Sequence, residues 1–252
     1  MYQPKYNLES SVNTYASSNQ NFNSYGSFNN FREDNVLNFL NYRDISNYNG
    51  DFVYSYNDRY NRRTNRAIGV IYSNDLSFFV KSLSDIEFKD AEIENVAKEV
   101  FVFVTGKEID DSIKINICPI DEFRELQIKF GVIGDNVQGF CINGEKLIFV
   151  KKMDIGGTLV VLGHELGHIF TNELKNKHDE EAKAFAFCIE WVKKIKEKNI
   201  LNLQESLNSD LRPAINGLHN VAFNFILENL SKGRTAMELY WELVYGIISL
   251  YN

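Results

Sequence analysis

The chain is poor in cysteine and proline and has no long apolar run. It contains three cysteines and three prolines in 252 residues, and the cysteines are far apart with no CxxC pair. An odd number of widely spaced cysteines argues against a disulfide framework or a cysteine-rich zinc module. No apolar run approaches the roughly 18–20 residues that a membrane-spanning helix needs, so we expect no membrane insertion.

The chain also lacks an excess of positive charge and a signal-like start. Its formal net charge is −7, which argues against nucleic-acid binding by the chain as a whole. The first residues, Met1-Tyr2-Gln3-Pro4, contain no basic segment followed by an apolar stretch, so we expect no secretory signal. Together with the cysteine pattern, these features predict a protein of the reducing cytoplasm.

Residues 1–66 differ in composition from the rest of the chain. They hold 15 asparagines and nine of the 13 tyrosines but few aliphatic residues. Such a segment cannot bury enough apolar surface to offset the entropy lost on ordering. We therefore predict a low-complexity, disordered tail with one short helix at Asp34–Tyr42. Its tyrosines make it a candidate surface for a protein partner, and the simpler alternative is a solvated leader without a specific role.

From residue 67 the pattern becomes globular. Apolar runs at 67–72 and 76–83 predict one hairpin, and Asn143-Gly144 between two apolar runs predicts another over 137–150. A further strand is expected at 113–117. Apolar residues at helical spacing predict six helices, at 90–104, 121–129, 158–174, 179–198, 214–231 and 234–250. This order predicts an α+β fold, with a domain over 67–200 and a C-terminal helical extension, 201–252, packed on the same domain.

The motif His164-Glu165-Leu166-Gly167-His168 carries the chemistry of this chain. Two histidines four apart on a helix lie on one face, where a single Zn²⁺ can accept a nitrogen from each. Glu165 lies beside them and can take a proton from a metal-bound water. Apolar residues on both sides predict a buried helix, and a dry surrounding strengthens the polarising effect of a metal. The alternative is a pair of core histidines bonded to backbone carbonyls.

A catalytic zinc usually takes three protein ligands and leaves one position for water. Leu174 stands where the metzincin pattern requires a histidine, so that pattern is excluded. His178 follows, in an expected turn. Glu181 heads an apolar stripe of the next helix, where a carboxylate directed at the core needs a partner such as a metal. Glu180 heads a similar stripe, so we favour Glu181 as the third ligand and keep Glu180 and His178 as alternatives.

The motif followed by a helix that reads Glu-Glu-Ala-Lys-Ala-Phe-Ala over residues 180–186 resembles the gluzincin metallopeptidases. It is most similar to the ImmA/IrrE-like group, whose second helix typically reads E-A-x-x-F-A. The resemblance implies a zincin-like metallopeptidase domain with a small antiparallel or mixed sheet, an HExxH helix and a C-terminal helical part. It also implies that Zn²⁺ is held by His164, His168 and Glu181 and that Glu165 is the general base.

The hairpin and two glycines are expected to shape this site. In zincins an edge strand above the metal holds the substrate backbone as an added strand. Either strand of the 137–150 hairpin is a candidate for that edge, and the alternative is a plain hairpin packed on the helix. Gly163 and Gly167 each cost roughly 1 kcal/mol in a helix, so we expect them to allow close approach of the hairpin or of the next helix.

These residues predict a zinc-dependent metallopeptidase that hydrolyses a peptide or protein substrate. The metal lowers the pKa of its bound water, and Glu165 passes the water's proton to the leaving amine. His219, Tyr240 and Tyr245 are candidates to stabilise the oxyanion, although the simpler reading of each is a surface or core side chain. The alternative function is a regulatory or binding protein of zincin fold that keeps the metal site and cleaves little. The ligand types also allow Mn²⁺ or Fe²⁺.

Overall fold

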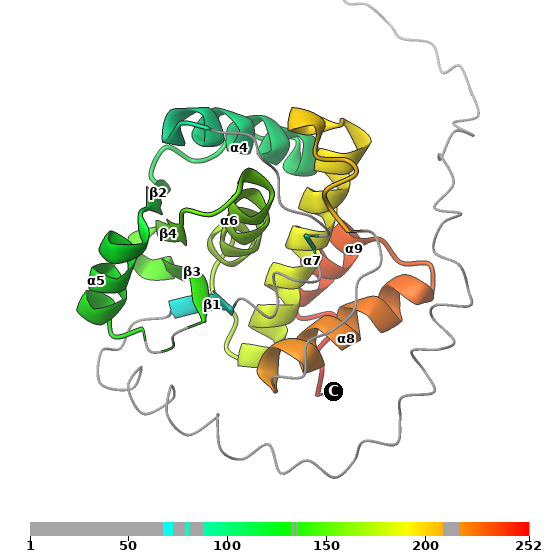
Figure 1. Ribbon diagram of the computed structural model, residues 1–252. Coiled ribbons are helices and arrows are strands. Elements are labelled where there is room, and N and C mark those ends of the chain that lie inside the picture. Colours follow the sequence, from blue (N-terminus) through cyan, green and yellow to red (C-terminus); the bar gives the residue numbers. More distant parts are fainter. Residues whose placement is uncertain are drawn as a thin grey trace, which may run out of the picture. The chain divides into compact units, whose positions relative to one another are not determined.

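The computed structural model (Figure 1) describes residues 68–72, 79–80, 88–132, 134, 136–208 and 217–251. Every described residue belongs to one compact unit, which falls within Arg43–Asn252. The predicted tail of residues 1–66, including its expected helix at Asp34–Tyr42, lies outside the described residues. So does the segment 209–216, which contains the first three residues of the helix predicted at 214–231.

The described strands form one small mixed sheet. Strand β1 (Ile68–Tyr72) pairs antiparallel with β3 (Val137–Ile142), and β3 pairs antiparallel with β4 (Leu147–Lys151). Strand β2 (Lys114–Cys118) pairs parallel with β4, so the strand order is β1-β3-β4-β2. With the helices described below, this sheet makes the fold α+β, as the order of elements along the chain predicts.

The Asn143-Gly144 hairpin is confirmed, and of its two open readings the structure agrees with a plain hairpin packed on helix α6 (Ile155–Ile169) rather than with a sheet edge. Strands β3 and β4 are joined by a short 3₁₀ turn, η1 (Asn143–Glu145), and Lys146 follows in the left-handed region at φ 53°. Both strands are inner strands of the described sheet, flanked by β1 and β2. Every residue of β3 is buried, and buried backbone N–H and C=O groups need hydrogen-bond partners. Strands β1 and β4 supply these partners, so β3 has no free edge for a substrate strand.

Among the described residues, strand β1 does not pair with the segment 76–83, where a local hairpin is expected. It pairs with β3 instead, with Ile68 opposite Ile142. The two described residues of the 76–83 segment lie elsewhere: Phe79 is buried, and Val80 forms an isolated bridge with Leu207. The turn residues between the two apolar runs suggest a pairing of neighbours in the sequence. In the structure, β1 instead pairs with β3, which is distant in the sequence and fully buried.

Two helices precede the candidate site. Helix α4 (Asp90–Thr105) and helix α5 (Ile120–Phe130) match the predictions of 90–104 and 121–129 within one residue. Both end at a glycine with positive φ, Gly106 (69°) and Gly131 (72°), because glycine tolerates the left-handed conformation that closes a helix. Helix α5 covers one face of the sheet with a separate aromatic core that includes Phe123, Phe130, Phe140 and Phe149.

Helix α6 (Ile155–Ile169) lies between the sheet and helix α7 (Lys177–Glu197), and all 15 of its residues are buried. It begins three residues before the predicted start because the Asp154 side chain caps it by accepting a hydrogen bond from Gly157 N. A Cβ at Gly167 would lie 2.9 Å from Ala184 Cα on α7, and one at Gly163 would lie 2.5 Å from the Trp191 ring. The expectation that these glycines admit the next helix is confirmed.

Helices α8 (Leu218–Ser231) and α9 (Ala236–Val244) pack on α7 and complete the described core. Helix α9 is shorter than the predicted 234–250, because the chain turns at Gly246 with φ 65°. The C-terminal segment then returns to α7, where Asp179 accepts hydrogen bonds from Ser249 Oγ and Leu250 N, each at 2.8 Å. Among the described helices, none combines the length and apolar character needed to cross a membrane.

Candidate metal centre

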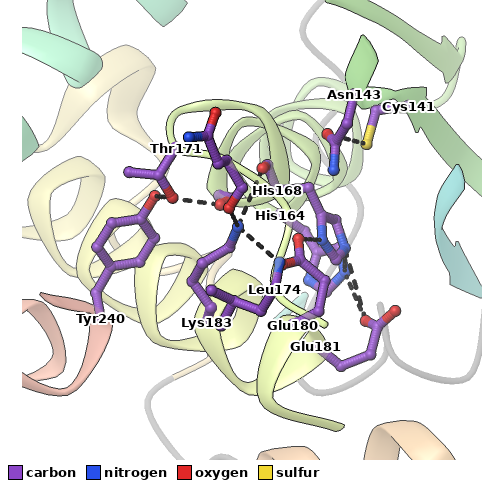
Figure 2. Close-up of polar contacts among 12 residues, drawn as sticks. Cys141, Asn143, His164, His168, Thr171, Leu174, Glu180, Glu181, Lys183 and Tyr240 are labelled. Carbon is purple, nitrogen blue, oxygen red and sulfur yellow. Dashed lines mark hydrogen bonds and ion pairs between the residues drawn. The ribbon is translucent and has the colours of Figure 1, made fainter. Parts of the chain in front are cut away.

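Helix α6 presents two histidines on the face that meets α7. His164 and His168 are four residues apart, one turn along the helix, and both are fully buried. Their Nε2 atoms lie 3.2 Å from each other. Figure 2 shows the two rings side by side. The two ring nitrogens therefore converge on one point between the helices, as the spacing in the motif predicts.

Helix α7 adds a carboxylate to this point. Glu181 Oε2 lies 3.4 Å from His164 Nε2 and 3.6 Å from His168 Nε2. One ligand atom from each of the three residues falls within 4.8 Å of the others, and no second group of this kind occurs among the described residues. Two imidazoles and one carboxylate match the donor set of a catalytic zinc site with three protein ligands, although the same donors also suit other divalent transition metals.

Of the three candidates for the third ligand, Glu181 faces the Nε2 atoms of the histidine pair, whereas Glu180 and His178 have other contacts. Glu180 Oε1 lies 2.8 Å from His168 Nδ1, on the side of the ring away from the convergence point. Its other oxygen accepts hydrogen bonds from Leu174 N at 2.7 Å and pairs with Lys183 Nζ at 2.9 Å. His178 packs edge-on against the Tyr251 ring, with the ring centres 4.9 Å apart. Glu181 is thus the candidate that the fold brings to the histidine pair.

Glu165 is buried next to the histidines, and both of its carboxylate oxygens lack a hydrogen-bond partner in the described part of the chain. Burial raises the pKa of Glu165 to about 7, against smaller opposing effects of His168 and the Cys141 thiol. Gly139 of β3 lies against it, because a Cβ there would come within 3.3 Å of Glu165 Oε1 and would collide with Val161. Such an acid can change its protonation state near neutral pH.

The charges around the histidines differ from one ring to the other. Burial lowers the pKa of His164 to about 4, which keeps its ring neutral near pH 7. Burial also opposes a charge on His168, but Glu181 and Glu180 outweigh it and raise its pKa. Burial likewise opposes ionisation of Glu181, whose pKa nevertheless lies well below its ordinary value because His219 and His168 face it. Two neutral imidazoles and an ionised carboxylate are the forms that bind a metal.

Of the three candidates for oxyanion stabilisation, the structure brings only His219 to this centre. Its Nε2, on α8, lies 3.4 Å from Glu181 Oε2. Tyr240 is buried on the far side of α6, where its hydroxyl lies 3.0 Å from Thr171 Oγ1 and 3.3 Å from the Gly167 carbonyl. Tyr245 is 70% exposed just beyond α9. For the two tyrosines the structure agrees with the simpler reading, a core side chain for Tyr240 and a surface side chain for Tyr245.

Three residues beside the site were not identified from the sequence. Lys183 is fully buried and contacts Glu180, and Cys141 and Gly139 on β3 lie next to Glu165. Lys183 carried one signal: it stands three residues after Glu180, on the same face of a helix, within an otherwise apolar stretch. Nothing local in β3 indicates that its residues face the motif, because that depends on the packing of the sheet against α6.

No protein-family model matches the chain, and neither a curated protein nor a solved structure matches it significantly. The arguments for its function therefore rest on the chemistry of the site.

Proposed function

We propose that the protein is a zinc-dependent metallopeptidase that hydrolyses peptide bonds in a peptide or protein substrate. One observation carries the proposal: two imidazole nitrogens and one carboxylate oxygen converge within 4.8 Å in a buried site. A second carboxylate lies beside them, that of Glu165, whose oxygens have no hydrogen-bond partner among the described residues. Unpartnered polar atoms are costly to bury, so their presence in a buried cluster indicates a missing partner. The resemblance of the HExxH motif and the following helix to the gluzincins supports the same function.

The donor set supports zinc as that partner. His164, His168 and Glu181 supply two nitrogens and one oxygen, which suits a tetrahedral ion with its fourth position open. When bound, the ion makes a water molecule more acidic and polarises the scissile carbonyl. Mn²⁺ or Fe²⁺ would accept the same donors, so the identity of the ion is part of the test.

Glu165 is the proposed general base. Its carboxylate accepts a proton from the attacking water as the new C–O bond forms, and then delivers this proton to the nitrogen of the leaving amine, so that the C–N bond breaks. An acid–base group works best when its pKa lies near the operating pH, and burial raises the pKa of Glu165 to about 7. His219, facing Glu181 from α8, is the proposed donor to the oxyanion of the substrate carbonyl.

A second candidate function is a regulatory or binding protein that keeps the metal centre and cleaves little. The burial of the centre favours it: His164, Glu165 and His168 are wholly inaccessible, and Glu181 is 7% exposed. A peptide must reach the open metal position to be cleaved, whereas a structural ion does not need such access. The presence of Glu165 favours catalysis, because a purely structural metal has no use for a base at this position.

The deciding experiment combines metal content with peptide cleavage. Elemental analysis should find about one zinc per chain in the wild type and much less in Glu181→Ala. A proteome-derived peptide library, read by mass spectrometry, should be cleaved by the wild type and not by Glu165→Gln, which should retain the metal. Glu190→Gln is the matched control, because Glu190 is a buried glutamate of α7 that pairs with Lys193 and Lys194.

The outcomes separate the candidates. Metal without cleavage in the wild type refutes the peptidase and supports the binding protein. Equal cleavage by the wild type and Glu165→Gln refutes Glu165 as the base. A wild-type chain without metal, even after reconstitution with zinc, refutes both functions.

A further inference from the structure

Lys183 is a fully buried lysine beside the metal centre that the proposed reaction does not use. An ammonium group has three N–H donors, and here each has one acceptor. Lys183 Nζ lies 2.9 Å from Glu180 Oε2 and 3.2 Å from each of the carbonyl oxygens of His168 and Asn172. Figure 2 shows the lysine reaching between the end of α6 and Glu180.

These contacts hold His168 at two points. The carbonyl of His168 is among the last four of α6, which have no partner within the helix, and Lys183 satisfies it. The ring of His168 meets Glu180, whose other oxygen is held by Lys183. A metal-ligating histidine commonly uses its second ring nitrogen in this way, and that contact sets which nitrogen carries the proton.

We propose that Lys183 is a positioning residue of the metal centre, and this inference rests on the metal site of the proposed function. Its ammonium and the Leu174 N–H together hold Glu180 Oε2, which leaves Oε1 as an acceptor for His168 Nδ1–H. With the proton on Nδ1, the lone pair of His168 Nε2 faces the convergence point. A proton on Nε2 would block the metal.

The same geometry predicts an unusual interaction between two substitutions. In Glu180→Gln the side chain has one oxygen and one NH₂ group, and it can offer an acceptor to only one side. Lys183 and Leu174 together attract the oxygen, so the NH₂ group turns to His168 and selects the tautomer with the proton on Nε2. Glu180→Gln should therefore lose metal affinity, and adding Lys183→Met should restore part of it, because the amide oxygen is then free to turn to His168.

The test measures zinc affinity by competition with a chromophoric chelator. We expect Lys183→Met and Glu180→Gln each to weaken binding about 10- to 100-fold, and the double variant to bind more tightly than Glu180→Gln alone. Lys196→Met is the matched control, because Lys196 also lies on α7 and donates to a backbone carbonyl, Leu207 O at 2.6 Å, away from the centre. It should bind zinc as the wild type does.

A purely structural lysine would give a different pattern. Wild-type affinity in Lys183→Met, or a double variant weaker than both single variants, would overturn the proposal. Should Lys183→Met fail to fold, the double variant still tests the proposal, because removing both the Glu180 carboxylate and the Lys183 ammonium leaves no unpaired buried charge. In the metal-free wild type, at a pH high enough for the His168 ring to be neutral, ¹⁵N NMR of the histidine rings should find its one proton on Nδ1. A neutral ring with its proton on Nε2 would overturn the proposal.

These readouts also separate this inference from the proposed function. A chain that binds zinc with the expected dependence on Lys183 but cleaves no peptide refutes the peptidase alone. A chain that cleaves peptides and is indifferent to Lys183→Met refutes the positioning role alone.

Discussion

Gly167→Ala tests whether the close approach of α6 and α7 assembles the candidate metal centre. The added Cβ would lie 2.9 Å from Ala184 Cα and Phe187 Cβ and 3.0 Å from the Ala184 carbonyl oxygen. Carbon atoms in contact lie about 3.5–4.0 Å apart, so the two helices must separate by roughly 0.6–1 Å. The obstructing atoms belong to the backbone or are attached directly to it, so a change of rotamer cannot relieve the contact.

The expected cost follows from two opposing effects. Replacing glycine by alanine in a helix stabilises it by about 1 kcal/mol, and overpacking a core costs about 1–3 kcal/mol. We expect a net loss of up to about 2 kcal/mol in the free energy of unfolding. The effect on metal binding should be larger, because ligand distances tolerate only about 0.2 Å and Glu181 would move away from the histidines. Zinc affinity should fall about tenfold or more.

Urea unfolding of the metal-free protein and zinc competition measure the two effects separately. Gly144→Ala is the matched control, because a Cβ there meets nothing within 4 Å, and it should change neither quantity. A Gly167→Ala protein as stable as the wild type and with the same zinc affinity would refute the argument that this glycine sets the distance between Glu181 and the histidines.

Three further predictions concern ionisation and the C-terminal segment. Because the pKa of Glu165 is raised by burial from 4.5 to about 7, the folded chain holds more protons than the unfolded chain between these values. In the metal-free protein, the stability of Glu165→Gln relative to the wild type should therefore grow as the pH rises from 4.5 to 7, and a constant difference would contradict this. Asp179→Ala should lower the free energy of unfolding by about 1–3 kcal/mol. It should also speed hydrogen exchange of the Leu250 amide, which donates to Asp179 in the wild type; unchanged exchange would argue that Asp179 does not hold the C-terminal segment. All three cysteines are buried, and burial raises the pKa of Cys118 to about 11, so Ellman's reagent should modify none of them before unfolding.

Most elements of the fold could be predicted from local patterns. The periodicity of α4 and α5 places these helices within one residue, and the Asn143-Gly144 turn identifies the β3–β4 hairpin. The spacing of the HExxH motif was enough to place His164 and His168 on one face of a buried helix. These features depend on residues close in the sequence, because helical rise and turn geometry act over a few residues.

Features that depend on distant segments could not be predicted in this way. The pairing of β1 with β3 and the inner positions of β3 and β4 require knowledge of which strand covers which neighbour. The choice between Glu180 and Glu181 is the clearest case, since both head apolar stripes of α7. The rotation of α7 against α6, where Gly163 and Gly167 admit Trp191 and Ala184, directs Glu181 to the convergence point and Glu180 to the far side of the His168 ring. A rotation between packed helices is the sum of many contacts across the core, so the sequence of α7 alone leaves it open.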